Sequence, residues 1–321
     1  MAKAIIFRFL FLAVLLVLMN FIYDKFLYEK DLLEHSPIIN LLRDAADADV
    51  VYLGESSNIT FKESDIDKRP ISAFVADYFQ GLTVKDITWP ASHAGIYKQL
   101  LYKIPESSNI KTVVVTLNLR SFNANWTYST LETSLQKSLV LLRDYPPLLN
   151  RFLLSFKSYD IKSEKERSIQ FKEKWKNDVL NFPYPFPHKN VIEWDKWMAG
   201  QGVASVDGQT DKAKTSLACH YIKTYAFQIN PMNNQRIKDF DEIIELSKKR
   251  GWNLVFNLLA ENTEKANQLV GDDLIYLMEG NRKILKSHFE NQGIAVVDNF
   301  NEIKDEEFID QDWTTEHYAE H

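Results

Sequence analysis

The stretch "IKTVVVTLNL", residues 110–119, decides the fold class of this chain. Its continuous run of apolar and β-branched residues is typical of a parallel strand that is buried on both faces. Shorter apolar runs of the same kind occur at residues 49–54, 84–90, 252–260 and 294–299. Segments with helical spacing separate these runs, at residues 71–80, 93–104, 239–251 and 274–293. This alternation predicts a three-layer α/β/α fold with a central parallel sheet.

Residues 121–238 interrupt the alternation. They contain long polar helical segments, the proline-rich "NFPYPFPHKN" and the glycine-containing "MAGQGVASVDGQ". The Lys- and Glu-rich run at 162–176 predicts a helix with a solvated face. We therefore expect a helical insertion at about 121–238 that forms a cap or a binding surface.

The first residues form the most apolar segment of the chain. Between residues 4 and 22, "AIIFRFLFLAVLLVLMNFI" is interrupted only by Arg8 and Asn20, and its length is close to the ~20 residues that cross a bilayer. Lys3 and Arg8 lie on its N-terminal side, whereas charges of both signs follow it. The positive-inside rule predicts a single-pass membrane protein with a cytoplasmic N-terminus and an extracytoplasmic domain, either periplasmic or at the cell surface. A cleaved signal peptide and a buried helix are the alternatives, although no small-residue cleavage site follows the run.

The expected domain organisation follows from these segments. We expect a transmembrane signal anchor at 1–25, a juxtamembrane segment at 26–47, and an α/β domain at 48–321 that carries the insertion. The formal net charge of −6 argues against a nucleic-acid partner, which needs a basic face on the protein. A single cysteine, Cys219, excludes an internal disulfide and a multi-cysteine zinc site. We expect no cofactor and no resident metal.

The turn "GESSN", residues 54–58, follows the first predicted strand. Ligands of open α/β sheets bind outside the carboxyl ends of the strands. A hydroxyl at this place, such as that of Ser56, can act as a nucleophile if a base is near and amides can hold an oxyanion. The alternative is that Ser56 or Ser57 only caps a helix.

Three further residues stand where such a site would need them. Asn118 ends the strand at 110–119, where its amide could donate to an oxyanion or could bond its own backbone in a turn. Gly95, after the second strand, could offer a backbone N–H or could be a simple loop glycine. In "FIDQDWTTEHYAEH" near the end of the chain, His317 has carboxylates close by and could be a general base or an ordinary surface residue.

These stretches, in this order, resemble the SGNH (GDSL-like) hydrolase superfamily. That family has a Gly-Asp-Ser block after the first strand, then a glycine, an asparagine and a C-terminal Asp-x-x-His block. Here "GES", Gly95, Asn118 and His317 correspond to them, over about residues 48–120 and 239–321. The resemblance implies a flavodoxin-like α/β/α fold in which Ser56 attacks a carbonyl and His317 is the base. It also implies an oxyanion hole formed by the Ser56 amide, Gly95 and Asn118.

The chain departs from the family pattern at two positions. Position 55 is Glu instead of Asp, and position 314, three before His317, is Thr, so the usual acid is missing from its place. We take Asp312 as the substitute acid. Asp310 and Glu316 remain alternatives.

A subset of this superfamily is similar in its single anchor and its diverged first block. It includes the teichoic-acid D-alanylation protein D and the alginate-acetylation proteins J and X, which work with membrane-bound O-acyltransferases. The resemblance implies a serine esterase or O-acyltransferase that acts on an acylated polysaccharide or glycolipid of the cell envelope, with a membrane-bound O-acyltransferase as a partner. The missing acid favours the alternative of a non-catalytic, membrane-anchored glycan-binding or scaffold protein.

The last five residues, "HYAEH", also match the inverted zinc-protease motif H-x-x-E-H. In that interpretation His317 and His321 would bind zinc, with Glu320 as the base. That class needs a further ligand downstream, and the sequence stops at His321. The abrupt end suggests that the sequence is truncated just after the motif.

Overall fold

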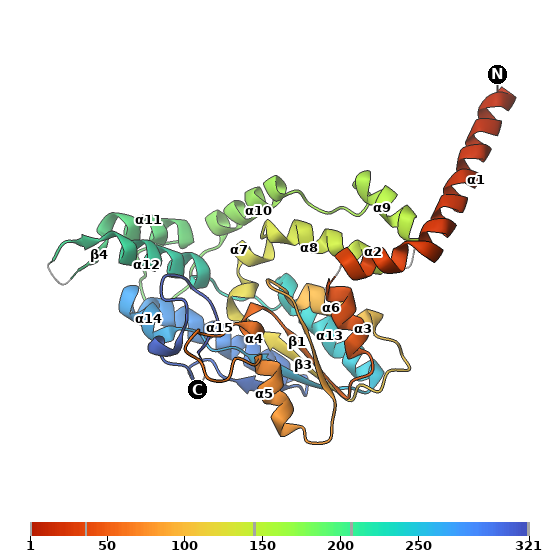
Figure 1. Ribbon diagram of the computed structural model, residues 1–321. Helices are drawn as coiled ribbons and strands as arrows, with labels where there is room; N and C mark the ends of the chain where they lie inside the picture. The colour runs from red at the N-terminus through yellow and green to blue at the C-terminus, as the bar shows by residue number, and fades with distance from the viewer. Residues whose placement is uncertain (1, 36, 144–145, 206–207, 320–321) are drawn as a thin grey trace.

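A five-stranded parallel sheet forms the centre of the computed structural model, which describes residues 2–35, 37–143, 146–205 and 208–319. The strands are β1 (Val50–Gly54), β2 (Val84–Thr88), β3 (Thr112–Leu117), β6 (Asn253–Leu258) and β7 (Ala295–Asp298). Their spatial order is β2-β1-β3-β6-β7, and Val50 of β1 pairs with Val84 of β2 and Thr112 of β3 (Figure 1). This arrangement confirms the predicted α/β fold with a central parallel sheet flanked by helices.

Helices precede, connect and follow the strands, as the alternation of the sequence predicts. They are α3 (Pro37–Ala45), α4 (Ser56–Ile59), α5 (Ile71–Tyr78), α6 (Ala94–Lys103), α13 (Gln235–Arg250), α14 (Thr263–Leu269) and α15 (Asp272–Glu290), with a 3-10 turn η3 (Asp305–Glu307). The helices α6, α13 and α15 pack on one face of the sheet, where the rings of Phe240, Phe256 and Phe289 lie 4.7–5.4 Å apart. Residues of α5 cover a smaller cluster on the other face, formed by Val50, Tyr52 and Val114. Successive strand residues point to opposite faces of the sheet. Because helices cover both faces, β1 is buried along its whole length.

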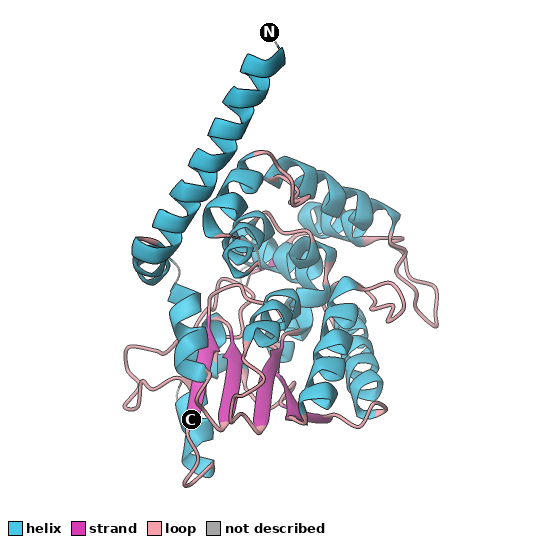
Figure 2. Cartoon of the chain, turned by 90° about the vertical axis from the view of Figure 1, so that its right-hand side faces the viewer, coloured by secondary structure: helices cyan, strands magenta, loops and turns pink. Residues whose placement is uncertain are grey.

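The segment between β3 and α13 is mostly helical. It comprises η1 (Leu119–Phe122), α7 (Ala124–Thr127), α8 (Leu131–Leu139), η2 (Val140–Leu142), α9 (Pro147–Ser155), α10 (Glu164–Asn177), α11 (Val191–Gln201), β4 (Val203–Ala204), β5 (Thr210–Asp211) and α12 (Lys212–Tyr225). Strand β3 leads directly into η1 and α7, so this segment begins at the carboxyl edge of the sheet. Figure 2 shows its helices stacked beyond that edge.

The apolar N-terminal segment forms α1 (Ala2–Phe26), followed by α2 (Tyr28–His35). The part Lys3–Phe26 is long and apolar enough to cross a membrane, and α1 projects away from the sheet (Figure 1). Its end contacts the helical segment, because the Leu148 N–H at the start of α9 donates to Asn20 Oδ1 at 3.1 Å.

Candidate active site

Ser56 and His317, which are 261 residues apart in the chain, lie side by side at the carboxyl end of β1. The Nε2 atom of His317 is 3.0 Å from Ser56 Oγ. Ser56 is the first residue of α4, directly beyond β1. His317 is held by a reversal of the C-terminal segment, in which the Ile309 N–H donates to the His317 carbonyl at 2.9 Å and Phe308 pairs with Tyr318.

The turn that presents Ser56 is tightly packed. A Cβ atom at Gly54 would lie 2.9 Å from Asn58 Cβ and 3.0 Å from Thr88 Oγ1, which explains the glycine. The Asn58 side chain accepts the Ser72 N–H at 2.7 Å and donates to Thr88 Oγ1 at 2.6 Å. These bonds tie α4 to β2 and α5, and so they hold the Ser56 backbone at the edge of the sheet.

The structure corrects the expectation that Asp312 orients His317. The carboxylate next to His317 Nδ1 is that of Asp310, at 2.6 Å, and Thr315 Oγ1 donates to the same Oδ2 atom at 2.6 Å. Asp312 is exposed. The chain reverses between residues 309 and 317, so the aspartate seven positions before His317 returns to its side.

Two of the expected oxyanion donors lie near this pair. Ser56 begins a helix, so its N–H has no intrahelical acceptor. Asn118 Nδ2 donates one hydrogen to Glu55 Oε1 at 2.5 Å, and the Asn118 side chain also hydrogen-bonds the Glu316 carboxyl. The Glu at position 55 thus has a structural use, because its carboxylate orients the Asn118 amide.

Gly95 does not present its N–H as expected. That N–H donates to His93 Nδ1 at 3.1 Å and is part of the N-terminal cap of α6. The loop before it lies against Glu55 and Asn118 instead, where Ala91 adopts a left-handed φ of 61°. The Ser92 hydroxyl in this loop is buried and has no hydrogen-bond partner within the described ranges.

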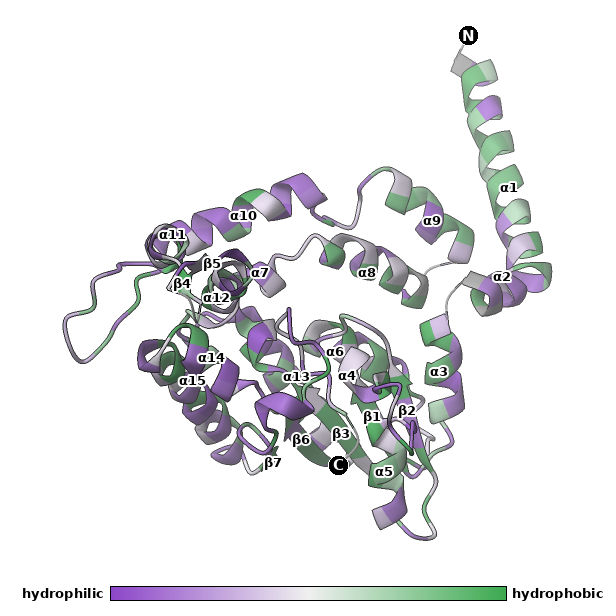
Figure 3. Cartoon of the chain, turned by 60° about the vertical axis from the view of Figure 1, so that its left-hand side comes forward, coloured by the Kyte–Doolittle hydropathy of each residue, from purple (hydrophilic) through white to green (hydrophobic). Residues whose placement is uncertain are grey.

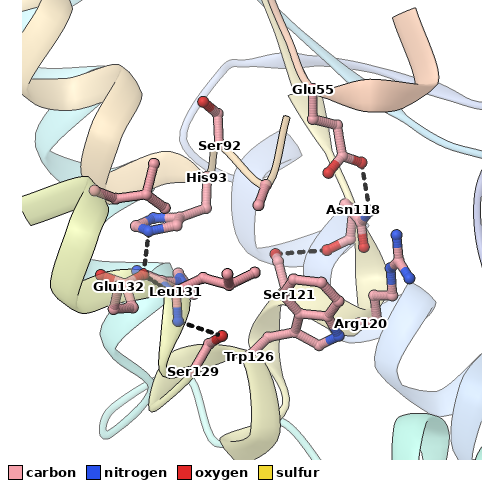
Figure 4. Close-up of a pocket in the computed structure, with 13 residues that line it drawn as sticks. Glu55, Ser92, His93, Asn118, Arg120, Ser121, Trp126, Ser129, Leu131 and Glu132 are labelled. Carbon is pink, nitrogen blue, oxygen red and sulfur yellow. Dashed lines mark hydrogen bonds and ion pairs between the residues drawn. The ribbon is translucent and has the colours of Figure 1, made fainter. Parts of the chain in front are cut away.

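Glu55, Ser92 and Asn118 line a cavity of about 20 Å³ (Figure 4). This volume suits about one water molecule. The small residues of "WPASHAG", at the end of the second strand, indicated in the sequence that this loop could line the site. Their spacing did not indicate which of them would face Asn118.

A buried charged cluster lies behind the Ser56–His317 pair. Arg120 in η1 donates to the Thr314 carbonyl, and its Nη2 is 2.6 Å from Glu316 Oε2. Burial raises the pKa of Glu316 to about 7, although the charge of Arg120 acts in the opposite direction. Burial also raises the pKa of Glu55 and, further, that of Glu261, which accepts the Tyr225 hydroxyl at 2.5 Å. Glu316 therefore forms a buried ion pair with Arg120, and the carboxylate that contacts His317 is that of Asp310.

A larger cavity of about 460 Å³ lies between α6 and α13 on one side and α8 and α10 on the other. Its wall includes Arg167, which is buried and donates to Thr133 Oγ1 at 3.2 Å and Gln136 Oε1 at 3.0 Å. Within the described part of the chain, Arg167 has no carboxylate at ion-pair distance. The run 162–176 was expected to present a solvated face, and Arg167 departs from that expectation because it points under α8.

Compared with models of known protein families and with curated protein sequences, the chain gives no match to either. Of the zinc-protease motif, Glu320 and His321 lie outside the described residues. Within the ranges that the structure describes, no group of three or more His, Cys, Asp and Glu side chains is arranged to hold a metal ion.

Proposed function

We propose that this protein is an SGNH-like serine esterase or O-acyltransferase that acts outside the cytoplasm on acyl groups of a cell-envelope polysaccharide or glycolipid. The observation that carries the proposal is the chain of contacts from Asp310 to His317 to Ser56, at 2.6 Å and 3.0 Å. A hydroxyl, an imidazole and a carboxylate in this order form the arrangement used for acyl transfer on several unrelated folds.

The proposed reaction has two halves. Ser56 Oγ attacks the ester carbonyl carbon while His317 Nε2 takes the hydroxyl proton. The Ser56 N–H donates to the resulting oxyanion, and Asn118 Nδ2 does so when one of its hydrogens turns from Glu316. The sugar oxygen then leaves with the proton from His317, and the acyl group remains on Ser56. Water or another sugar hydroxyl next gives its proton to His317 and attacks the acyl-serine, which restores Ser56.

The cavity of about 460 Å³ supports a large polar substrate. It shares His93, Glu132 and Arg236 with the small cavity beside Glu55 and Asn118, so the two adjoin. A buried guanidinium without a carboxylate, such as that of Arg167, is costly unless an anion binds to it. An acidic envelope polymer therefore fits this wall better than a neutral one. A membrane-bound O-acyltransferase would be a suitable partner for a chain whose α1 can cross the membrane.

A second candidate is a non-catalytic glycan-binding or scaffold protein. The observation that favours it is the occupation of two oxyanion donors, since Asn118 Nδ2 is bound to Glu55 and the Gly95 N–H to His93. A site that cannot hold an oxyanion would still bind a polymer in the larger cavity.

Labelling with a serine-directed fluorophosphonate tests the proposal on the full chain in detergent micelles. Wild type should be labelled and should hydrolyse p-nitrophenyl acetate, and Ser56→Ala should lose both. Ser57→Ala is the matched control, because it removes the neighbouring hydroxyl and should keep both. If wild type is not labelled but retains binding to an acidic polysaccharide, the scaffold function replaces the enzymatic one.

A further inference from the structure

The helix α9 carries an exposed apolar face. Leu149, Phe152 and Phe156 have exposed fractions of 41%, 49% and 66%. The residues are spaced at i, i+3 and i+7, which places their side chains on one side of the helix. The rings of Phe152 and Phe156 lie 4.8 Å apart, so they form a continuous apolar surface.

The helix α9 lies beside the end of α1, which it contacts through Leu148 and Arg151. Besides the bond from Leu148 N–H to Asn20 Oδ1, Arg151 of α9 pairs with Asp31 and lies over the ring of Tyr23, 5.7 Å from its centre. Figures 1 and 3 both show α9 next to the domain-proximal end of α1, and Figure 3 shows both helices as largely hydrophobic. The apolar face of α9 is therefore level with the last turns of the segment that can cross the membrane.

Basic side chains lie on the side of the helix that carries Arg151, Leu154 and Ser155. A hollow of about 800 Å³ next to α9 is lined by Lys137, Arg151, Lys157, Lys162 and Lys165, and by the acids Asp160, Glu164 and Glu166. Cations thus exceed acids here, although the chain as a whole has a formal net charge of −6. An amphipathic helix with basic neighbours and exposed aromatic residues is typical of segments that lie in a membrane interface.

We propose that α9 is an interfacial helix. Leu149, Phe152 and Phe156 insert into the bilayer that α1 crosses, and the basic residues of the adjoining hollow contact anionic lipid headgroups. The helical segment is then held at the membrane surface by a second contact in addition to α1. The inference goes beyond the proposed enzyme function and does not depend on Ser56, but it does require α1 to be inserted.

Spin-label depth measurements on the full chain in lipid nanodiscs test the proposal. Single cysteines are introduced as Phe152→Cys and Phe156→Cys in a Cys219→Ala background, with Met232→Cys, at a side chain that is 83% exposed, as the control. Labels at 152 and 156 should be more accessible to oxygen than to a water-soluble nickel chelate, as expected inside a bilayer, and the label at 232 should show the reverse. If the labels at 152 and 156 behave like the label at 232, the interfacial helix is wrong.

The headgroup contact is tested by comparing nanodiscs of phosphatidylcholine with nanodiscs that also contain phosphatidylglycerol. The anionic lipid should increase the depth of the labels, and Lys137→Gln combined with Lys157→Gln and Lys165→Gln should remove the increase. Equal depths in both membranes would overturn the contact with anionic headgroups. Fluorophosphonate labelling of Ser56 is measured separately, so a failure of the enzyme proposal would not be mistaken for a failure of this one.

Discussion

Two histidines of this protein face a carboxylate near the carboxyl edge of the sheet, and they do so in opposite ways. His317 has Asp310 at Nδ1 and the Ser56 hydroxyl at Nε2. His93 accepts the Gly95 N–H at Nδ1 and contacts Glu132 through Nε2. The partners require opposite tautomers, because the carboxylate accepts a hydrogen bond from Nδ1–H of His317 but from Nε2–H of His93.

The difference shows what makes a histidine–carboxylate pair suitable for acid–base work. The lone pair of His317 Nε2 points at a hydroxyl, whereas the lone pair of His93 Nδ1 is used by a helix cap. Burial and the charge of Arg236 lower the pKa of His93, despite the opposing contact with Glu132. Both nitrogens of His93 therefore serve structure, and only His317 has a nitrogen that faces a candidate nucleophile.

The largest effect should separate the two histidines. His317→Ala should lower ester turnover about 10³-fold or more, since a general base is lost, with little change in stability. His93→Ala should do the opposite, with a loss of about 1–3 kcal/mol in the free energy of unfolding because Glu132 and the Gly95 N–H lose a partner. Ester turnover per mole of protein and thermal unfolding measure the two effects. Equal losses of turnover in the two variants would contradict the assignment.

A smaller effect should identify the carboxylate. Asp310→Asn should reduce turnover by about 10²–10⁴-fold, because the amide no longer fixes the His317 tautomer. Asp312→Asn is the matched control at an exposed position and should stay within about twofold of wild type. The reverse order of the two variants would show that the reversal at 309–317 is not as described.

The carboxylate of the other pair is expected to matter for stability. Glu132 is buried and also pairs with Arg236 at 2.6 Å. Burial acts to raise its pKa, but the contact with His93 and the charge of Arg236 prevail and lower that pKa to about 2. Glu132→Ala should cost about 3 kcal/mol, since it removes the nearer carboxylate from the buried Arg236 guanidinium and leaves it only Asp239, at 3.5 Å. Urea unfolding in detergent measures this, and a loss below about 1 kcal/mol would contradict it.

The last effect concerns pH and the carboxylates behind His317. Glu55, Glu261 and Glu316 all have a raised pKa, which for Glu316 is about 7 against an ordinary 4.5. They bind protons more tightly in the folded state, so their contribution to stability is complete below about 4.5 and is lost as pH rises through the raised values. The free energy of unfolding should therefore fall between about pH 5 and about pH 8, by up to ~1.4 kcal/mol per pH unit for each extra proton held.

Glu261→Gln isolates one of these protons. The Gln amide oxygen can still accept the Tyr225 hydroxyl, so the bond is kept while the titrating group is removed. The fall in unfolding free energy with pH should become shallower than in wild type. An unchanged slope would mean that Glu261 holds no extra proton.

Parts of the molecule could be predicted from the sequence, because their causes lie within a few residues. The apolar run at 110–119 predicted β3, and the alternation around it predicted the parallel sheet. The apolar segment at residues 4–22 predicted a helix long enough to cross a membrane, and α1 is such a helix. Strand-end placement marked Ser56 and Asn118 as candidates, and neighbouring carboxylates marked His317, although their catalytic roles remain predictions.

Only the tertiary structure decided which partners these candidates have. From the sequence we took Asp312 as the acid and kept Asp310 as an alternative, whereas the reversal of the chain at 309–317 places Asp310 beside His317. The sequence allowed a free N–H at Gly95, but in the structure that N–H donates to His93. It also allowed an exposed Arg167, but in the structure α8 covers that side chain. Local patterns specify strands and helices because only near neighbours are involved. Contacts between distant segments depend on how the whole chain packs, and spacing along the sequence does not encode that.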